Sequence, residues 1–589
     1  MRTFLAFTIA MTLTVSAQQP TLPAGYWPQA KSDEILQKSE TIRLAPDLSS
    51  LDAEEKAALD DLLQVGAVMQ KLYELSRHHE ALTAFDQLRV VDVRLGQPKA
   101  TQNLLTLYRL FQGPIATTPD NDRVPFIPVA PQSPTRNVYP LDATRAEIDA
   151  FLAENPSLRD EILAERTIVR RATHANLDRD LTILATFAAL RELHPQTLSR
   201  LQRLKSFATP SGFYGVPYSI AYADELVPAY RLLMRAASRL EASDAEFARY
   251  LRNRGRDLLT NDYESGDASW ITGRFKRLNA QIGAYETYDD PLFGVKAFHG
   301  MSILMQNEEA TTELRRALGS IQEIENALPY EPRKRVRDDI PVGVYDVIAD
   351  FGQARGTNTA TILPNDPLFS SRYGRTILLR GNIMKHPSLF AASQRIWRAA
   401  AADRHADDLA PEGNFERTLW HEIGHYLGPD RDKAGRTLDV ALEDYASSVE
   451  EMKADLVSLF AAHRMELPSL RAIQSSGILR TLQNVKPRRD QPYQTMQLVQ
   501  FNWFVDKGLI VPDRKTARLT IDYERYPAAV ASLLKEVLAL QQAGDKAATA
   551  AFYDRWTSWT PELHDRLASR IRDAQGVRWR VVRYEALGE

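Results

Sequence analysis

The feature that most constrains this chain is a pair of histidines four residues apart, His421 and His425, with Glu422 directly after the first. Residues four apart on an α-helix share one face, so both imidazoles can reach a single metal ion if this segment is helical. A stop signal at Gly428-Pro429 and apolar residues at helical spacing predict such a helix. The apolar positions are Phe415, Leu419, Ile423 and Tyr426.

The HExxH motif at 421–425 is stronger evidence for a metal site if it rarely arises by chance. In a chain of this length and histidine content, HExxH is expected roughly 0.01 times by chance. The alternative is a surface helix with two unrelated histidines, and the motif favours the metal site. Another histidine pair, His78 and His79, lies in a segment with helical pattern, 52–95. Adjacent residues on a helix point about 100° apart, so we expect this pair at the surface without a shared ligand.

A zinc site of this kind needs a third ligand, and segment 447–463 supplies candidates. Glu451 and Asp455 lie four residues apart, and Glu450 adjoins them. We predict that Glu451 is the third ligand, while Asp455 and Glu450 support the site from behind. A carboxylate in that supporting position accepts a hydrogen bond from a ligand histidine and fixes its tautomer. An apolar stripe on another face predicts that the segment is a helix. Its members are Val449, Met452, Leu456, Leu459 and Phe460. Taken alone, the acidic face would be interpreted as solvent-exposed.

The donor set predicts a catalytic site. The chain has no cysteine, which excludes disulfides, thiolate ligands and cysteine nucleophiles. Two histidines and a glutamate leave the fourth position of a Zn²⁺ ion open for water, as in catalytic zinc sites. We expect one Zn²⁺ per chain, with Glu422 taking a proton from the water that the metal activates. Attack on a carbonyl, followed by protonation of the leaving nitrogen, predicts hydrolysis of a peptide or amide bond.

The rest of the pattern predicts a mainly α protein with a small β core, an α+β fold. Helical spacing dominates both ends of the 589 residues, and a proline-rich, extended stretch covers 113–140. Short strand candidates in the middle are bounded by glycine, proline or asparagine. They are 297–305, 342–349, 359–363 and 375–380, with a last one at 578–584.

Charge and the N-terminal residues bear on partners and location. The 73 basic and 76 acidic residues nearly balance, so nothing favours nucleic acid or an anionic membrane as a partner. Residues 1–17 have the pattern of a signal peptide, with Arg2, a short apolar stretch and small residues before a cleavage point after Ala17. We expect export to the periplasm or outside the cell. The apolar stretch is short for a membrane span, and no other span is expected.

The second motif points to a family. EEMKAD at 450–455 resembles the EExxAD or EExxAE motif of the dipeptidyl peptidase III family. That family usually carries HELLGH, and some bacterial members carry the five-residue form found here, HEIGH. IGAYETYDDPLFGVKAF at 282–298 resembles the family segment IGFIESYRDP. The resemblance implies that Tyr288 stabilises the tetrahedral intermediate.

Two further stretches resemble the family, one of them with a departure. TILPND at 361–366, followed by GRTILLRGN at 374–382, resembles the substrate-binding strand and loop, and implies that Asn365 contacts the peptide. Ile362 stands where the family has another asparagine. YQTMQLVQFN at 493–502 resembles the stretch that carries a functional histidine, but this chain has Thr495 there. What that histidine contributes is lost or supplied by another group.

The resemblance also implies an architecture and an activity. It implies two lobes around a wide cleft, with the zinc site on a helical lobe. We therefore divide the chain into a signal peptide (1–17), an N-terminal helical and proline-rich segment (18–140), a lobe with the β core and substrate-binding strand (141–385) and a zinc-binding, mainly helical lobe with the C-terminal segment (386–589). The implied activity is release of dipeptides from the N-termini of short peptides.

Two alternatives stay open. One is a zinc amidase or oligopeptidase of different specificity. The other is a zinc-containing peptide-binding protein with little catalysis, for which Thr495 is the support in the sequence. The sequence does not predict the oligomeric state.

Overall fold

The computed structural model describes most of the chain. The described residues are 22–119, 122–287, 289–319, 321–336, 342–363, 372–373, 376–442, 445–487, 491–513 and 515–589. The predicted signal peptide at 1–17 lies outside the described residues and stays a prediction.

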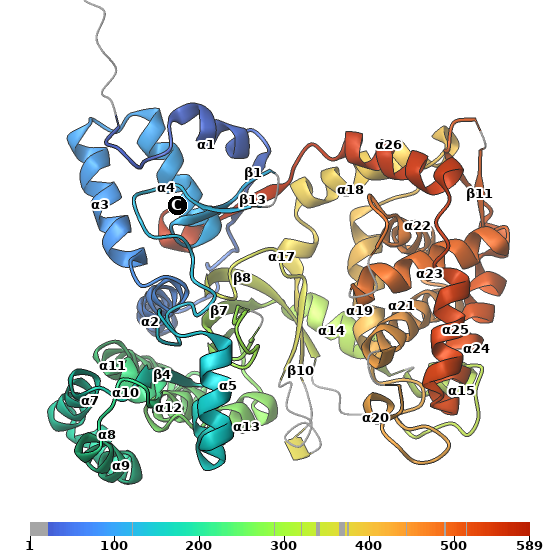
Figure 1. Cartoon of the computed structure of the whole chain (residues 1–589). Coiled ribbons are helices and arrows are strands. Elements are labelled where there is room, and N and C mark those ends of the chain that lie inside the picture. Colours follow the sequence, from blue (N-terminus) through green and yellow to red (C-terminus); the bar gives the residue numbers. More distant parts are fainter. Residues whose placement is uncertain are drawn as a thin grey trace, which may run out of the picture.

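The N-terminal half of the chain forms a first lobe, blue to green in Figure 1, that consists mainly of helices. Its longest helix, α2 (Ala53–Arg77), begins with a capping box in which Asp52 and Glu55 each accept a hydrogen bond from the other's amide. The other helices are α1 (Gln29–Leu36), α3 (Ala81–Arg94), α4 (Lys99–Phe111), α5 (Arg145–Glu154), α6 (Arg159–Ile162), α7 (His174–Thr186), α8 (Ala188–Leu193), α9 (Pro195–Ser206), α10 (Tyr218–Ala221), α11 (Ala223–Leu240), α12 (Ala245–Thr260) and α13 (Glu264–Thr272).

The C-terminal half forms a second, helical lobe, mainly yellow to red in Figure 1. The largest hydrophobic core of the described residues lies here, and helices α19 (Pro411–Gly424), α21 (Ala446–Arg464) and α24 (Tyr526–Ala543) contribute to it. The remaining helices of this half are α14 (Glu308–Leu318), α15 (Ile321–Ala327), α17 (Gly381–Met384), α18 (Pro387–Ala400), α20 (Leu438–Leu442), α22 (Leu470–Thr481), α23 (Pro492–Asp506), α25 (Lys546–Trp556) and α26 (Arg566–Ala574).

A five-stranded sheet lies between the two helical masses (Figure 1). Its order is β6-β7-β8-β10-β9, and only the β8–β10 pair of this sheet is parallel. The strands are β6 (Leu278–Ala284), β7 (His299–Gln306), β8 (Val342–Gly352), β9 (Ala360–Leu363) and β10 (Thr376–Arg380). Three of the four described two-stranded pairs join neighbours in sequence: β2 (Ile115–Thr117) with β3 (Arg123–Pro125), β4 (Thr167–Arg171) with β5 (Phe213–Pro217), and β11 (Ile510–Pro512) with β12 (Leu519–Ile521).

The end of the chain returns to the first lobe. Strand β13 (Trp579–Tyr584) pairs in parallel with β1 (Ser39–Leu44), near the N-terminus. The buried Tyr584 hydroxyl donates to Asp350 of β8 at 3.3 Å, and Arg380 of β10 contacts the same carboxylate at 2.9 Å. The C-terminal residues therefore help to hold the central sheet.

The predicted fold class is confirmed: the chain is mainly helical with a small β core. All five strand candidates correspond to observed strands, namely β7, β8, β9, β10 and β13. The other eight strands of the described residues, β1 to β6, β11 and β12, were not predicted. The residues of β6 do alternate, with apolar side chains at Leu278, Ala280 and Ile282 and polar ones at Asn279 and Gln281, so this strand could have been predicted.

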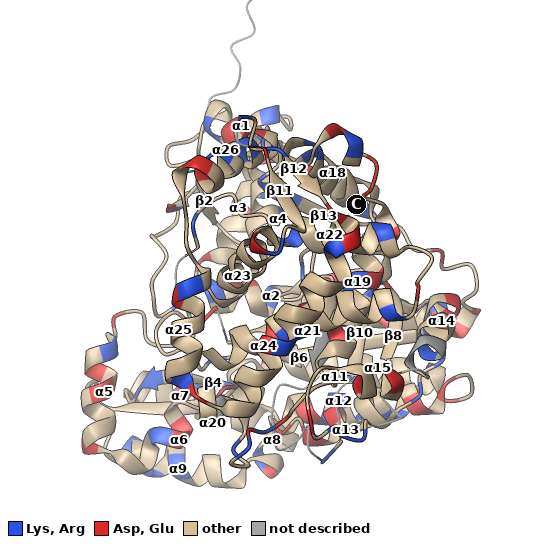
Figure 2. Cartoon of the chain, turned by 90° about the vertical axis from the view of Figure 1, so that its right-hand side faces the viewer, with Lys and Arg blue, Asp and Glu red and all other residues tan. Residues whose placement is uncertain are grey.

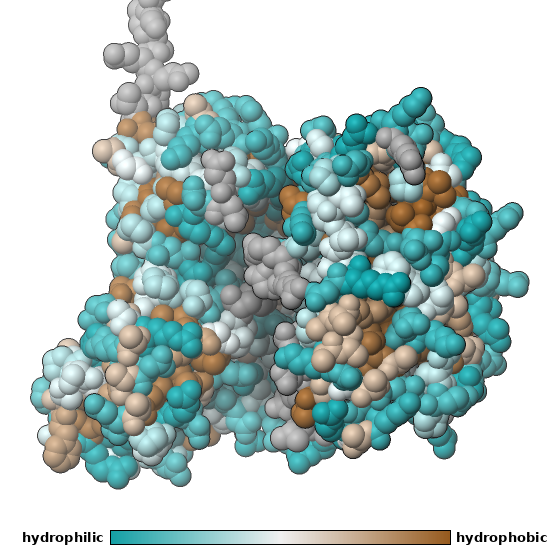
Figure 3. Space-filling model, turned by 45° about the vertical axis from the view of Figure 1, so that its right-hand side comes forward, coloured by the Kyte–Doolittle hydropathy of each residue, from teal (hydrophilic) through white to brown (hydrophobic). Residues whose placement is uncertain are grey.

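The surface carries mixed charges and a hollow. Basic and acidic residues are interspersed over the face in Figure 2. The space-filling view in Figure 3 is hollowed along the line between the two lobes. Among the described residues, no helix combines the length and apolar character needed to cross a bilayer.

Close packing of α2 on the central sheet generates a first prediction. A Cβ atom added at Gly66 would lie 2.2 Å from the ring of Phe351 on β8, and that ring is buried. Gly66→Ala should therefore lower the urea unfolding midpoint, with a loss of about 1–3 kcal/mol from overpacking, although alanine favours helices. The control is Ala67→Gly at the exposed neighbouring position, which should cost only the helix propensity, about 1 kcal/mol. An increase in stability for Gly66→Ala would contradict this packing.

Candidate metal centre

The candidate site lies where α19 packs against α21. Gly424 makes the contact close, because a Cβ atom at this position would lie 3.0 Å from both Cα and the carbonyl oxygen of Ala454. Helix α19 also approaches α22 closely at Gly413, where an added Cβ would lie 2.3 Å from the carbonyl oxygen of Ala472. Small residues thus fix the helix that carries the two histidines against both neighbours.

The structure brings His421, His425 and Glu451 together. One potential ligand atom from each lies within 4.8 Å of the other two. Glu451 Oε2 is 3.2 Å from His421 Nε2 and 3.9 Å from His425 Nε2. Tetrahedral ligands about 2.0–2.1 Å from a Zn²⁺ ion lie roughly 3.3 Å apart, so these spacings fit one ion of that size. The two imidazole planes are nearly perpendicular, at 89°.

Carboxylates behind the histidines orient both rings. His421 Nδ1 lies 2.8 Å from Asp455 Oδ1, and His425 Nδ1 lies 3.0 Å from Glu450 Oε1. An ionised carboxylate only accepts hydrogen bonds, so each Nδ1 donates, and in the neutral imidazole each Nε2 keeps its lone pair for a metal ion. Metal-binding histidines are commonly held in this way. Glu450 and Asp455 therefore have the geometry that the sequence analysis expected of them.

A buried lysine links the two helices. Lys453 Nζ lies 2.7 Å from Glu450 Oε1 and donates to the carbonyl oxygens of Gly424 and Leu427, both at 2.7 Å. A cation bonded to the last carbonyls of a helix stabilises its C-terminus. Gln541 of α24 donates to the other oxygen of Glu450 at 2.9 Å. Burial alone would raise the pKa of Glu450, but Lys453 and His425 outweigh it and hold the pKa at about 2.

Two arginines balance the charge of Asp455. Arg480 Nε lies 3.0 and 3.1 Å from its two oxygens, and Arg417 lies 3.2 Å from Oδ1. Burial would raise the pKa of this carboxyl, but Arg480 and His421 lower it well below its usual range. Burial would likewise lower the pKa of His421, but Asp455 and Glu451 outweigh it and raise the pKa to about 9. Asp455 is thus a fixed negative charge directly behind the ring.

Two other side chains complete the centre. Glu422 is 9% exposed, and within the described part of the chain its side-chain carboxylate makes no hydrogen bond or ion pair. Tyr493, from the first turn of α23, donates its hydroxyl hydrogen to Glu451 Oε1 at 2.9 Å. Burial and the charge of Glu451 raise the pKa of Tyr493 above its usual value.

The site includes residues that the sequence analysis did not single out. Lys453 and Arg417 could have been found, because Lys453 lies three residues after Glu450 and Arg417 four before His421, both at helical spacing. Tyr493 and Arg480 come from other helices, and no local spacing relates them to the motif. The expected functional residues Tyr288 and Asn365 lie outside the described residues, so their roles stay predictions.

The expectation that both residues of the other histidine pair lie at the surface holds for His79, which is exposed, and was wrong for His78. His78 is buried at the end of α2 with an extended backbone, and its ring stacks on that of His79 with centroids 5.1 Å apart. Together with Glu80 they could offer three ligands. However, His78 Nε2 lies 3.0 Å from the carbonyl oxygen of Ala130, and Nδ1 is 3.2 Å from the Glu80 amide. Because both ring nitrogens are engaged, we assign no metal to this group.

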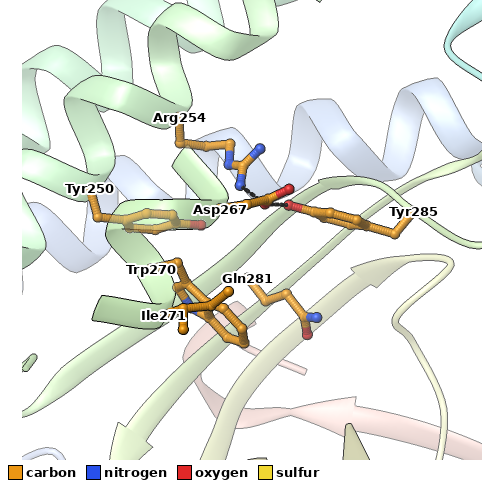
Figure 4. A pocket seen from close by; sticks show the side chains of 7 residues that line it. All are labelled: Tyr250, Arg254, Asp267, Trp270, Ile271, Gln281 and Tyr285. Carbon is orange, nitrogen blue, oxygen red and sulfur yellow. Dashed lines mark hydrogen bonds and ion pairs between the residues drawn. The ribbon is translucent and has the colours of Figure 1, made fainter. Parts of the chain in front are cut away.

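A small pocket in the first lobe contains none of the candidate ligands (Figure 4). Asp267 occupies its centre and accepts hydrogen bonds from the guanidinium of Arg254 and, at 2.6 Å, from the hydroxyl of Tyr285. The lining residues are Tyr250, Arg254, Asp267, Trp270, Ile271, Gln281 and Tyr285. These contacts tie the end of β6 to α12 and α13.

The arrangement behind His421 generates a second prediction. Asp455→Asn removes the negative charge that orients the ring and leaves Arg417 and Arg480 without their shared partner. Loss of such a supporting carboxylate typically weakens metal binding about 10–100-fold. Zinc affinity should fall by that factor in a competition titration with a chelating dye. The matched control is Asp573→Asn at an exposed position of α26, and equal affinities for both variants would contradict the role of Asp455.

Comparisons with known proteins agree with this architecture. No known family model matches the chain. A structure of dipeptidyl peptidase III from Caldithrix abyssi has a TM-score of 0.77 and 23% identity, with 94% of this chain and 99% of that chain covered. One from Corallococcus sp. strain EGB has a TM-score of 0.70 and 24% identity, with 96% and 98% covered.

A curated relative carries a different name. The chain is 25% identical over 462 residues to Nudix hydrolase 3 of Arabidopsis thaliana. The match covers 74% of this chain and spans only 56% of that protein. At 23% and 24% sequence identity, the two solved structures show similarity of fold alone. The resemblance seen in the sequence motifs is therefore confirmed at that level: the chain has the dipeptidyl peptidase III fold.

Proposed function

We propose that this protein is a zinc-dependent peptide hydrolase that releases dipeptides from the N-termini of short peptides. The observation that carries the proposal is the group His421, His425 and Glu451, whose ligand atoms lie within 4.8 Å of one another. Two nitrogens and one oxygen suit Zn²⁺, and three protein ligands leave one position open, as in catalytic zinc sites. One ion per chain is expected.

A bound zinc ion supplies Lewis-acid polarisation of the scissile carbonyl and lowers the pKa of water. The chain's own residues do the rest. Asp455 and Glu450 hold the imidazoles with their Nε2 atoms free for the metal. Glu422 follows His421 on the same helix, and its carboxylate has no partner among the described residues. It is therefore free to take a proton from the attacking water and to return it to the leaving nitrogen.

The fold supports a peptide as the substrate. Both solved structures described above carry the name dipeptidyl peptidase III and cover nearly the whole chain. We place the peptide in the hollow of the surface between the lobes (Figure 3). Tyr288 and Asn365 remain our proposed contacts to the reacting carbonyl and to the peptide, on the strength of the sequence resemblance.

Substitution of Glu422→Gln tests the mechanism. The amide keeps the shape of the side chain but does not accept a proton, so kcat should fall by about 10²–10⁴-fold while zinc content stays at one per chain. The assay uses release of arylamine from a panel of dipeptidyl-arylamides, before and after treatment with a chelator. Glu412→Gln, exposed in the first turn of the same helix, is the matched control. Undiminished hydrolysis by Glu422→Gln would overturn the mechanism.

The same panel separates the alternatives. Chelator-sensitive release of dipeptides only from substrates with a free N-terminus supports the exopeptidase. Cleavage of internally quenched or N-acetylated peptides without dipeptide release moves the assignment to an oligopeptidase or amidase. Zinc binding with peptide capture and no turnover of any substrate identifies a binding protein.

We also propose that the protein is exported, on the basis of the signal-peptide pattern in residues 1–17. Expression of the full chain in a bacterium with a periplasm, followed by N-terminal sequencing of the periplasmic fraction, should give a chain starting at Gln18. Recovery only of the uncleaved chain in the cytoplasm would contradict export.

A further inference from the structure

The two oxygens of Glu451 have different partners. Oε2 faces both histidines, at 3.2 Å from His421 Nε2 and 3.9 Å from His425 Nε2. Oε1 accepts a hydrogen bond from the Tyr493 hydroxyl at 2.9 Å. A carboxylate can bind a metal ion through one oxygen or through both. Here one oxygen is directed toward the histidine nitrogens, and the other is bound to a phenol from a different helix.

A contact to the backbone of the preceding residue, rather than burial of the aromatic ring, fixes the position of Tyr493. The residue is 48% exposed, although it carries a large aromatic side chain. It follows Pro492, which starts α23. Ser448 of α21 lies one turn before Glu451, and its hydroxyl contacts the carbonyl oxygen of Pro492 at 3.2 Å. The helix that carries Glu451 thus holds the start of α23, and the phenol reaches back to that same helix.

We propose that Tyr493 is a positioning residue that restricts Glu451 to binding the metal ion through one oxygen. If Glu451 bound through both oxygens, the second would occupy the position that water and the substrate carbonyl need. The hydrogen bond from Tyr493 favours binding of the metal ion through Oε2 alone, because Oε1 already accepts a charge-assisted hydrogen bond. This inference rests on the proposed function, through the assignment of Glu451 as a ligand.

The test uses Tyr493→Phe with Co²⁺ as the probe in place of zinc. The visible absorption of Co²⁺ is intense in four-coordinate sites and weaker when the coordination number rises. Tyr493→Phe should still bind one Co²⁺ per chain, but with a weaker visible band than the unmodified protein. In the zinc form, kcat should fall about 10–100-fold, as for other residues that support metal ligands, with KM nearly unchanged.

The matched control is Tyr553→Phe. The Tyr553 hydroxyl bonds Ser448 at 2.6 Å, so it contacts the same helix but not Glu451. This variant should keep the Co²⁺ spectrum of the unmodified protein, which separates loss of the Glu451 bond from general loosening of α21. An unchanged spectrum in folded Tyr493→Phe, or the same change in both variants, would overturn the inference.

The results that would contradict the proposed peptidase function differ from those that would contradict the role of Tyr493. If the unmodified protein takes up Co²⁺, loses it in His421→Ala and hydrolyses no peptide, the peptidase assignment fails. The spectral comparison of Tyr493→Phe with Tyr553→Phe still decides the role of Tyr493. If the unmodified protein binds no Co²⁺ at this site, Glu451 is not a ligand and the inference fails with it.

Discussion

The candidate site depends on how closely α19 packs against α21. Gly424 lies between the two histidines, against the backbone of Ala454, and an added methyl group would meet Cα and the carbonyl oxygen at 3.0 Å. Ala454 itself lies between Glu451 and Asp455. The small residues therefore stand within the two motifs. They let the functional side chains of one helix reach those of the other, and larger residues would separate the helices.

Burying this many charges is costly unless each has a partner. Glu450, Asp455 and Lys453 are held in place by ion pairs and hydrogen bonds, with Arg417 and Arg480 on the far side of Asp455. The pairs form two layers. The outer layer consists of the lysine and the arginines, and the inner layer consists of carboxylates that face the histidines. The outer cations keep the inner carboxylates ionised, and ionised carboxylates leave the imidazole Nε2 atoms available for a metal ion.

Much of this could be predicted from sequence because the signals are local. The histidine pair, the acidic residues at 450–455 and their helices follow from a spacing of three or four residues, and the short strands from apolar runs between turn residues. Contacts between distant elements could not be predicted. The stretch at 493–502 was expected to be functional, but nothing in it indicates that Tyr493 reaches Glu451, and nothing in residues 39–44 indicates pairing with 579–584. The surface position expected for His78 was wrong because α2 ends at Arg77, so the helical geometry assumed for this residue does not apply.

The central claim is that α19 and α21 together hold one metal ion through His421, His425 and Glu451. Anomalous diffraction from crystals of the zinc-loaded protein, recorded on both sides of the zinc absorption edge, tests it most directly. The account predicts one strong peak per chain, about 2.0–2.1 Å from the Nε2 atoms of both histidines and about 2.0–2.2 Å from one oxygen of Glu451. A peak located elsewhere, or none at this site in zinc-loaded crystals, would contradict it.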